Sequence, residues 1–338
     1  MKISGVVVTA NRSNLLTKCL TSLLASANDI STKFIELEFN VICNGQDVQS
    51  KKVAYEVLNE KQLKFFQIEK PLFPGAARNL ALENVTGDWI FFADDDIYVE
   101  KDFFSQFEDL VMKRPEYSVI GGPNLTPPDS TSFQELSGQA LASPFASFYC
   151  SQRYKISQES TDVDDTALTL CNLFVKTKAL GDIRFSNSLL CAEENFVLAF
   201  LEKKGCRFLA SPGLKVYHER RDTLSGFARQ LLKYGHGRGQ LILRGEAQWF
   251  HFVPLVCVIL FLIFPIFSVT KIFLIPMVAL YFVGVLRAAG VIVLNSNNSF
   301  KEIPFLSFLI MTIHVHYAIG MSRGMVFELF SKVDNLRN

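Results

Sequence analysis

The segment Asp88-Trp89-Ile90-Phe91-Phe92-Ala93-Asp94-Asp95-Asp96-Ile97-Tyr98 decides the fold of this chain. Its residues 89–93 are mostly apolar and carry no charge, which predicts a strand that is buried on both faces of a sheet. Three carboxylates follow at the carboxyl end of that strand, where open α/β sheets hold their ligands. Because adjacent carboxylates repel one another, the triplet indicates a bound cation, and Mg²⁺ or Mn²⁺ held against phosphate oxygens suits such ligands. The alternative is a solvated acidic turn that caps a helix beginning near Lys101.

The composition narrows the class of protein. A chain of 338 residues can hold one large domain or two ordinary ones. Its 34 basic and 33 acidic residues nearly cancel, so no global electrostatic field favours nucleic acid as a partner. The 7 cysteines are an odd number without a CxxC pair or a metal-finger spacing, which predicts reduced thiols in a cytosolic compartment. The apolar run at residues 3–8 is too short for a signal peptide, so we expect a first strand there.

Strand-like and helix-like patterns alternate along the chain before the acidic triplet. We expect strands at Ile3–Thr9, Leu37–Cys43 and Leu63–Ile68, and helices after Ser13, near Val48–Asn59 and over Ala76–Asn84. Such βαβ units predict an α/β fold with a mostly parallel sheet. The loops at the carboxyl ends of its strands would meet at one edge, where a nucleotide would bind.

Several short motifs stand in a characteristic order. They are Thr9-Ala10-Asn11-Arg12, Asn44-Gly45-Gln46-Asp47, Gly75-Ala76-Ala77-Arg78-Asn79, Ala93-Asp94-Asp95-Asp96, Ala192-Glu193-Glu194-Asn195 and Val216-Tyr217-His218. In order and spacing they resemble the inverting glycosyltransferases of family 2, which have the Rossmann-like GT-A fold. The resemblance covers residues 3–240. It is closest to membrane-anchored members that build bacterial exopolysaccharides on lipid carriers.

The resemblance implies a donor-binding set at the carboxyl edge of the sheet. This set comprises Thr9, Asn11, Arg12, Asn44, Asp47, Gly75, Arg78, Asp94 and Asp95. The first loop and the turn after the second strand would hold the nucleotide base, Arg78 the nucleotide and Asp94 the ribose. The carboxylate that the family usually has at the end of the second strand is replaced by Cys43, and Asp47 is the candidate to substitute for it. Without the resemblance, Arg78 would be a helix-surface arginine. We expect Asp95 to point away from its two neighbours, because side chains alternate along an extended segment.

The resemblance also implies a metal site and a catalytic base. Asp96, Asp94 and His218 would bind Mg²⁺ or Mn²⁺ beside the diphosphate, whereas a lone histidine at a strand end is ordinarily only hydrogen-bonded. Glu193 and Glu194 would supply the base that takes the proton of the acceptor hydroxyl. We favour Glu194, which stands at the usual Asp position of the family. The residues alone favour a simpler account, in which acids in the first turn of a helix stabilise its dipole.

Three further segments concern the binding of the acceptor and the link from the catalytic domain to the end of the chain. Gln230–Tyr234 is similar to the QxxRW element of polysaccharide synthases, with Lys233 and Tyr234 in place of Arg and Trp, and would hold the diphosphate or the acceptor. Its degraded form favours transfer of a single sugar. The polar, aperiodic segment Ser151–Thr166 predicts a mobile loop over the acceptor cleft or an ordinary surface loop. The glycines of Gly235–Gly239 predict a flexible joint.

Long apolar runs dominate the end of the chain. We predict a catalytic domain over residues 1–245 and membrane-anchoring helices over residues 246–338. The runs 249–269 and 272–294 are each long enough to cross a hydrocarbon layer of about 30 Å and would form a hairpin. A third run, 303–330, could span, but its basic tail favours an interfacial helix. Basic residues before the hairpin place the catalytic domain on the cytoplasmic side of a bacterial inner membrane. Arg287 either reaches the membrane surface or grips the phosphate of a lipid carrier.

These features together predict an inverting glycosyltransferase that moves one sugar from a nucleotide-sugar donor to a lipid-linked, polyprenyl-type glycan at the cytoplasmic membrane face. Its partners would be the donor, the acceptor and membrane lipids, but not nucleic acid, and no oligomeric state is indicated. One alternative makes polyprenyl phosphate itself the acceptor. The other is a non-catalytic membrane scaffold of a glycan assembly complex, which the missing carboxylate at Cys43 favours.

Overall fold

The computed structural model describes residues 1–29, 35–245, 256 and 271–337. By the contacts among its residues, the chain divides into two compact units. The first unit comprises Met1–Asp129, Gln152–Leu189 and Glu193–Glu219, and the second comprises Ser130–Ser151, Leu190–Ala192 and Arg220–Asn338.

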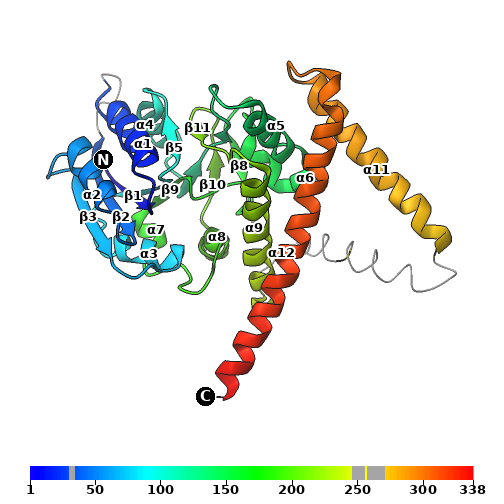
Figure 1. Ribbon diagram of the computed structural model, residues 1–338. Coiled ribbons are helices and arrows are strands. Elements are labelled where there is room, and N and C mark those ends of the chain that lie inside the picture. Colours follow the sequence, from blue (N-terminus) through cyan, green and yellow to red (C-terminus); the bar gives the residue numbers. More distant parts are fainter. Residues whose placement is uncertain (30–34, 246–255, 257–270, 338) are drawn as a thin grey trace. The chain divides into compact units, whose positions relative to one another are not determined.

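The first unit is built on a mixed, eight-stranded sheet (Figure 1). The spatial order is β3 (Leu63–Ile68), β2 (Glu36–Asn44), β1 (Lys2–Thr9), β4 (Trp89–Asp94), β9 (Asn172–Lys176), β6 (Val119–Gly121), β10 (Phe208–Ala210) and β8 (Thr161–Val163). Strands β3, β2, β1 and β4 are mutually parallel. Because β9 runs antiparallel to both β4 and β6, the strands β6 and β10 run in the same direction as β4. The prediction of an α/β fold with a mostly parallel sheet is confirmed.

Alternating side chains of the central strands pack against helices on both faces of the sheet. One core joins Val7 and Phe91 to the helices α1 (Ser13–Ala27), α2 (Val48–Val57) and α4 (Phe103–Lys113). The other core joins Val6 and Phe92 to α3 (Pro74–Leu82), α7 (Thr177–Leu180) and α8 (Glu193–Lys203). Since neighbouring residues of β1 and β4 belong to opposite cores, both strands are buried on both sides, as the uncharged run at residues 89–93 predicts.

A small three-stranded sheet adjoins the acidic triplet. It consists of β5 (Ile97–Val99), β11 (Val216–His218) and β7 (Asn124–Leu125), in that spatial order with β11 central. β5 begins immediately after Asp96, and β11 pairs with it antiparallel so that His218 lies opposite Ile97. This register brings a histidine that is far away in the sequence to the acidic triplet.

The prediction of a loop over Ser151–Thr166 is wrong in part. Its first residues belong to the 3₁₀ helix η1 (Phe148–Tyr154), and Thr161–Val163 form the edge strand β8, antiparallel to β10. The side chains of β8 are exposed or half-buried. An edge strand with polar side chains needs no apolar alternation, so periodicity could not indicate it.

The second unit is helical within the described residues. Its elements are α5 (Ser132–Leu141), α6 (Pro144–Ser147), α9 (Leu224–Arg244), α11 (Lys271–Leu294), η5 (Phe300–Glu302) and α12 (Ile303–Arg337). The predicted first span, 249–269, lies outside the described residues, whereas α11 covers the second predicted span and α12 the third. The segments Ile275–Leu294 and Phe300–Ser331 are long and apolar enough to cross a membrane, by length and composition.

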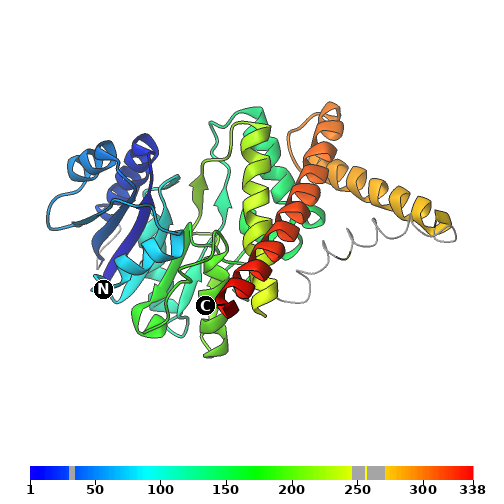
Figure 2. The same ribbon diagram turned by 60° about the horizontal axis from the view of Figure 1, so that its bottom comes forward.

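Helices α9 and α12 lie side by side along a seam of glycines (Figures 1 and 2). Gly235 and Gly239 of α9 face the α12 backbone at Tyr317 and Met321, while Gly320 and Gly324 of α12 face the α9 backbone at Leu232 and His236. A Cβ atom at any of these four glycines would collide with backbone atoms of the other helix. The prediction of a flexible joint at Gly235–Gly239 is therefore wrong, because these glycines lie inside a helix and allow close backbone contact.

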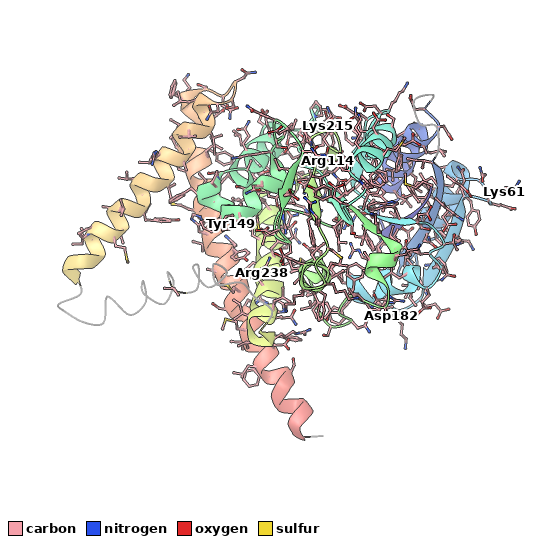
Figure 3. All side chains as sticks on the ribbon, turned by 180° about the vertical axis from the view of Figure 1, so that it is seen from behind. Lys61, Arg114, Tyr149, Asp182, Lys215 and Arg238 are labelled. Atoms are coloured by element: carbon pink, nitrogen blue, oxygen red, sulfur yellow. The ribbon has the colours of Figure 1, made fainter. Side chains whose placement is uncertain are left out.

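A partly buried ion pair closes one end of this seam. Arg244 donates from Nε and Nη2 to the two carboxylate oxygens of Glu328, both at 3.0 Å, and Gln240 donates to the same carboxylate at 3.2 Å. Arg238 of α9, which Figure 3 labels, is buried and lies between Gly235 and Gly239 in the sequence. Helix α9 thus contacts the apolar α12 through glycines and polar side chains. For this reason the sequence of α9 shows no long apolar run, although the helix packs closely against α12.

Candidate active site

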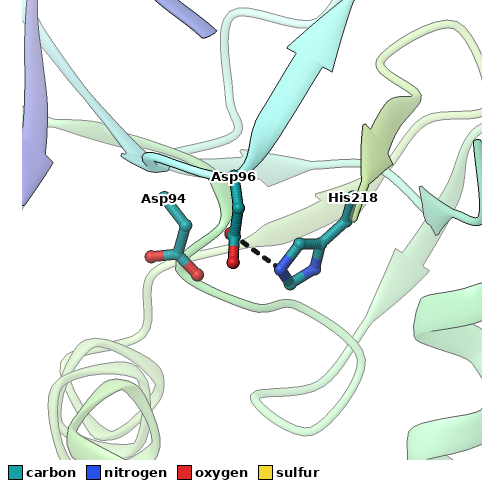
Figure 4. A group of neighbouring side chains, drawn as sticks. All are labelled: Asp94, Asp96 and His218. Carbon is teal, nitrogen blue, oxygen red and sulfur yellow. Dashed lines mark ion pairs between the residues drawn. The ribbon is translucent and has the colours of Figure 1, made fainter. Parts of the chain in front are cut away.

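The carboxyl end of β4 carries a cluster that can hold a metal ion. One ligand atom from each of Asp94, Asp96 and His218 lies within 4.8 Å of the others (Figure 4). The Nε2 atom of His218 lies 2.9 Å from Oδ1 of Asp96. Burial lowers the pKa of His218, but the Asp96 carboxylate outweighs this effect and raises the pKa to about 10. Two carboxylates and one imidazole fit a divalent cation of the Mg²⁺ or Mn²⁺ type, which would replace the imidazolium proton as their shared positive charge.

Arg12 supplies positive charge to the same triplet. The turn after β1 passes through Asn11 with a φ of 55°, a left-handed conformation that asparagine tolerates better than most residues. From this turn, Nη1 of Arg12 reaches Asp95 Oδ1 at 3.0 Å and Asp96 Oδ2 at 2.8 Å. Burial raises the pKa of Asp95 to about 7, although Arg12 and Thr9 act to lower it. Asp95 and Asp96 share one cation because residues 95 and 96 form a turn, so the alternation expected of an extended segment does not apply.

Arg78 joins the triplet to the start of α8. It is buried rather than on the helix surface, and its Nη1 atom lies 2.5 Å from Glu193 Oε1, while Nη2 lies 3.1 Å from Asp94 Oδ1. Burial raises the pKa of Glu193, and Arg78 acts in the opposite direction. Gly75, on the same helix, packs against the backbone of Ser186, which leaves no room for a side chain. One buried guanidinium therefore connects Asp94 to Glu193, and Glu193 lies 115 residues after Arg78 in the chain.

Glu194 has a different partner from its neighbour. Its carboxylate lies 3.8 Å from Nη1 of Arg153, a residue that the motifs did not indicate. Arg153 also donates from Nε to the backbone oxygen of Thr166 at 2.7 Å. The only signal in the sequence was a cation within the polar segment 151–166, and no spacing rule connects that cation to an acid on α8.

Two of the residues assigned to the nucleotide base, Asn44 and Asp47, hydrogen-bond to nearby backbone. Asn44 donates to the backbone oxygen of Leu72 at 2.9 Å and accepts from its N–H at 2.8 Å. Asp47 caps α2 by accepting from two backbone N–H groups at 3.1 Å. Cys43 is buried and accepts from Gln67 at 3.4 Å. These contacts fix the turn after β2 at the same edge as the acidic triplet.

The residues assigned to the acceptor or diphosphate belong to the second unit. Gln230 donates to the hydroxyl of Tyr234 at 2.9 Å on α9, and Lys233 lies on the same helix. Arg287 is exposed on α11. The structure thus brings together the predicted metal, ribose and base residues of the first unit, and groups the QxxRW-like residues and Arg287 in the second.

Comparisons with known proteins decide the family. The sequence profile described as Glycosyl transferase family 2 matches residues 4–176, which is more than half of the chain. This chain belongs to that family. The family 2 glycosyltransferase has the GT-A fold, with the acidic triplet inside the matched region and Glu193, Glu194 and His218 beyond it. A non-catalytic scaffold is thereby set aside in favour of an enzyme.

Solved structures agree on the fold of this family 2 glycosyltransferase. S. aureus TarS 1-349 in complex with UDP-GlcNAc is similar at a TM-score of 0.52 and 17% identity, covering 95% of this chain and 91% of that one. The mannosyltransferase PcManGT from Pyrobaculum calidifontis in complex with GDP-Man and Mn²⁺ is similar at a TM-score of 0.55 and 14% identity, covering 98% and 87%. No curated protein sequence matches the chain.

Proposed function

We propose that this enzyme transfers a single sugar, with inversion, from a nucleotide sugar to a lipid-linked glycan at the cytoplasmic face of a bacterial membrane. The observation that carries the donor half of the proposal is the cluster of Asp94, Asp96 and His218 at the carboxyl edge of the sheet. Similar folds have been solved with UDP-GlcNAc and with GDP-Man and Mn²⁺. A nucleoside diphosphate places two phosphates where such an edge holds ligands.

The donor set would bind the nucleotide sugar around this cluster. Thr9, Asn11 and the turn from Asn44 to Asp47 would surround the base, with Asp94 on the ribose side and Asp95 holding Arg12. Arg78 then acts through the two carboxylates that it holds, because both of its contacts are already made inside the protein. Arg12 would release Asp96 as a metal binds, since one carboxylate oxygen gains more from a divalent ion than from a shared guanidinium.

The metal we propose is Mn²⁺ in preference to Mg²⁺. Both ions accept carboxylate oxygens, but a third ligand from the imidazole of His218 suits the softer ion better. When bound, the ion offsets the negative charge that develops on the departing diphosphate. The chain itself contributes the fixed positions of the three ligands, which two separate sheets hold.

Glu194 is the proposed general base. Glu193 is bound by Arg78 at 2.5 Å, whereas the nearest cation to Glu194 is 3.8 Å away, so Glu194 is the acid of the pair that can accept a proton. In the reaction, the acceptor O–H would give its proton to Glu194 as the oxygen bonds to the anomeric carbon. The bond from that carbon to the diphosphate oxygen breaks, and the nucleoside diphosphate leaves with the bonding electron pair.

The membrane half of the proposal rests on the second unit. Helix α11 and the first part of α12 would anchor the enzyme, with Arg287 near a phosphate of the lipid carrier. The apolar segment Phe300–Ser331, which comprises η5 and most of α12, exceeds the hydrocarbon thickness of about 30 Å at 1.5 Å per residue, so part of it would lie outside the hydrocarbon. The part outside the hydrocarbon would be the one that contains Gly320 and Gly324, because it pairs with α9, which carries three arginines and one lysine.

Binding of UDP and GDP to the full chain in detergent, with and without Mn²⁺, tests the donor half. We expect Mn²⁺ to strengthen binding at least tenfold, and Asp96→Asn to remove that gain. Asp88→Asn is the matched control, because Asp88 precedes the same strand at its other end and its carboxylate accepts from the backbone N–H of Lys2. Equal binding with and without Mn²⁺ by the unchanged protein would refute the proposed metal site.

Glu194→Gln separates the two acceptor chemistries. With a hydroxyl acceptor, loss of the base should slow transfer by about 10² to 10⁴ and leave nucleoside diphosphate binding intact. With polyprenyl phosphate as the acceptor no proton needs removal, and the substitution would be nearly harmless. Transfer from a labelled nucleotide sugar to membrane extract distinguishes these outcomes.

A further inference from the structure

A pocket of about 290 Å³ lies in the half of the sheet beyond β9. Gly122 and Pro123 line it directly after β6, and Ala210 and Ser211 line it at the end of β10. Because β6 and β10 run parallel to β4, these residues stand at the same edge of the sheet as Asp94. The strands β6 and β10 lie two and three strands from β4, so a strand spacing of about 4.8 Å puts the pocket about 10 to 15 Å from the acidic triplet. A second substrate could bind at that distance from the donor.

The lining of this pocket is apolar with two cations. Pro123, Ile156 and Leu168 form part of its apolar wall, and Arg153 and Lys155 bring the positive charge. Among the described residues that line it, none is acidic. The volume is near the lower limit of about 300 Å³ for small-molecule sites, which fits one sugar- or polyol-sized unit rather than an oligomer.

The two cations differ in what already surrounds them. Arg153 is held by Thr166 and Glu194, so its guanidinium lies between the pocket and the proposed base. No ion pair of Lys155 is found within the described residues, and burial alone lowers the pKa of its ammonium group. The side chain of Lys155 is exposed and lines the pocket, so an anion bound there would supply its ammonium group with a partner.

We propose that this pocket binds a phosphate group of the acceptor, next to the hydroxyl that receives the sugar. Lys155 and Arg153 would hold the phosphate, the apolar wall would contact the carbon skeleton, and the shared guanidinium would bring the adjoining hydroxyl toward Glu194. The inference rests on the proposed glycosyl transfer and adds the chemical class of the acceptor: a phosphorylated sugar or polyol, either water-soluble or carried as a phospholipid headgroup.

Binding to the full chain in detergent tests the pocket independently of catalysis. The probes are glucose 6-phosphate and glycerol 3-phosphate, each compared with glucose or glycerol. We expect the phosphorylated probe to bind at least tenfold more tightly, and Lys155→Gln to remove most of that preference. Lys178→Gln, which replaces an exposed lysine at the opposite edge of the sheet, should leave it unchanged.

A lipid arm distinguishes the source of the phosphate. Vesicles of phosphatidylcholine with and without phosphatidylglycerol are compared for the unchanged protein and for Lys155→Gln. A preference for phosphatidylglycerol that depends on Lys155 supports a lipid headgroup, while a Lys155-dependent preference for the soluble probes alone supports a soluble acceptor.

Two outcomes would overturn the proposal. One is equal binding of phosphorylated and neutral probes in every arm. The other is a Lys155→Gln protein that loses affinity for UDP or GDP, because the pocket would then serve the donor diphosphate. If UDP and GDP bind with Mn²⁺ but the phosphate preference is missing, the proposed function survives and only the acceptor class fails.

Discussion

The two edges of the central sheet treat buried charge in opposite ways. At the amino edge, one buried carboxylate, Glu38, accepts from Ser4 at 2.6 Å and Thr86 at 2.8 Å, and pairs with Lys2 at 2.9 Å and with Lys64. At the carboxyl edge the acids outnumber the arginines, and both Arg12 and Arg78 are divided between two carboxylates. One edge surrounds a single charge with several partners, while the other lacks positive charge that a divalent ion can supply.

This difference teaches how to separate stability from function among buried acids. A carboxylate with a full set of donors stabilises the fold, because its hydrogen bonds and ion pairs outweigh the loss of hydration. Carboxylates that share too few cations repel one another in the absence of a ligand. We therefore expect substitutions at the amino edge to change unfolding, and substitutions in the acidic triplet to change chemistry.

Asp96→Asn should have the largest effect. Loss of the ligand that contacts both Arg12 and His218 is expected to slow sugar transfer by about 10⁴, or about 5 kcal/mol. The midpoint of thermal unfolding should stay within about 3 °C, because neutralising one acid also removes repulsion within the triplet. Transfer assays and thermal unfolding of the same preparation check both halves. A large fall in the midpoint would break the comparison, since the triplet would then stabilise the fold.

Arg78→Met is expected to destabilise the protein by about 4 kcal/mol, because Glu193 remains buried without its partner. At this one pair of the carboxyl edge, as at the amino edge, loss of a partner of a buried carboxylate should lower the stability of the fold. Adding Glu193→Gln should recover at least half of the loss, as measured by chemical denaturation. The matched control Arg184→Met removes an exposed arginine that only contacts nearby backbone oxygens, so it should change the unfolding free energy by less than about 0.5 kcal/mol.

Glu38→Gln sharpens the comparison through its pH dependence. Burial opposes ionisation of Glu38, but hydrogen bonds from Ser4, Lys2 and Thr86 lower its pKa from 4.5 to about 2. A lowered pKa contributes stability that is fully present above about pH 4.5 and is lost as the pH falls towards 2. The variant should therefore be less stable by about 3 kcal/mol at pH 7, and the two proteins should converge in acid. Denaturation curves between pH 7 and 3 measure this, and a constant gap would contradict it.

Lys64→Met should have the smallest effect. Its pair with Glu38 at 3.4 Å is partly solvent-exposed, and Glu38 keeps Lys2, Ser4 and Thr86 as partners. The expected loss is about 0.5 kcal/mol, with transfer activity unchanged. Chemical denaturation at low and high salt provides the check. A loss near that of Glu38→Gln would mean that the amino-edge cluster depends on one cation and has no surplus of partners.

Much of the first unit could be predicted from its sequence, because the determining signals are local. The uncharged run at residues 89–93 and the helical spacing after Ser13 indicate β4 and α1 without knowledge of their neighbours. The family motifs ordered the acids, the arginine and the histidine that the structure brings to one edge. The register of β11 against β5 carries His218 there, and only tertiary structure specifies that register.

The failures share a physical cause, which is that the deciding contact is distant in the sequence. The role of Arg153 depends on its ion pair with Glu194. Strand β8 forms because it pairs with β10. In the sequence alone, the glycines of Gly235–Gly239 indicated a flexible backbone. In the structure, Gly235 and Gly239 instead belong to a closely packed helix, because the neighbouring backbone of α12 leaves no room for a side chain.

The glycine seam also limits how α9 and α12 can move. A slip by one residue, about 1.5 Å along the axis, would set a side chain against a carbonyl where a hydrogen atom now fits. The two helices must therefore travel as one body, and any displacement of the apolar helix reaches its basic companion undiminished.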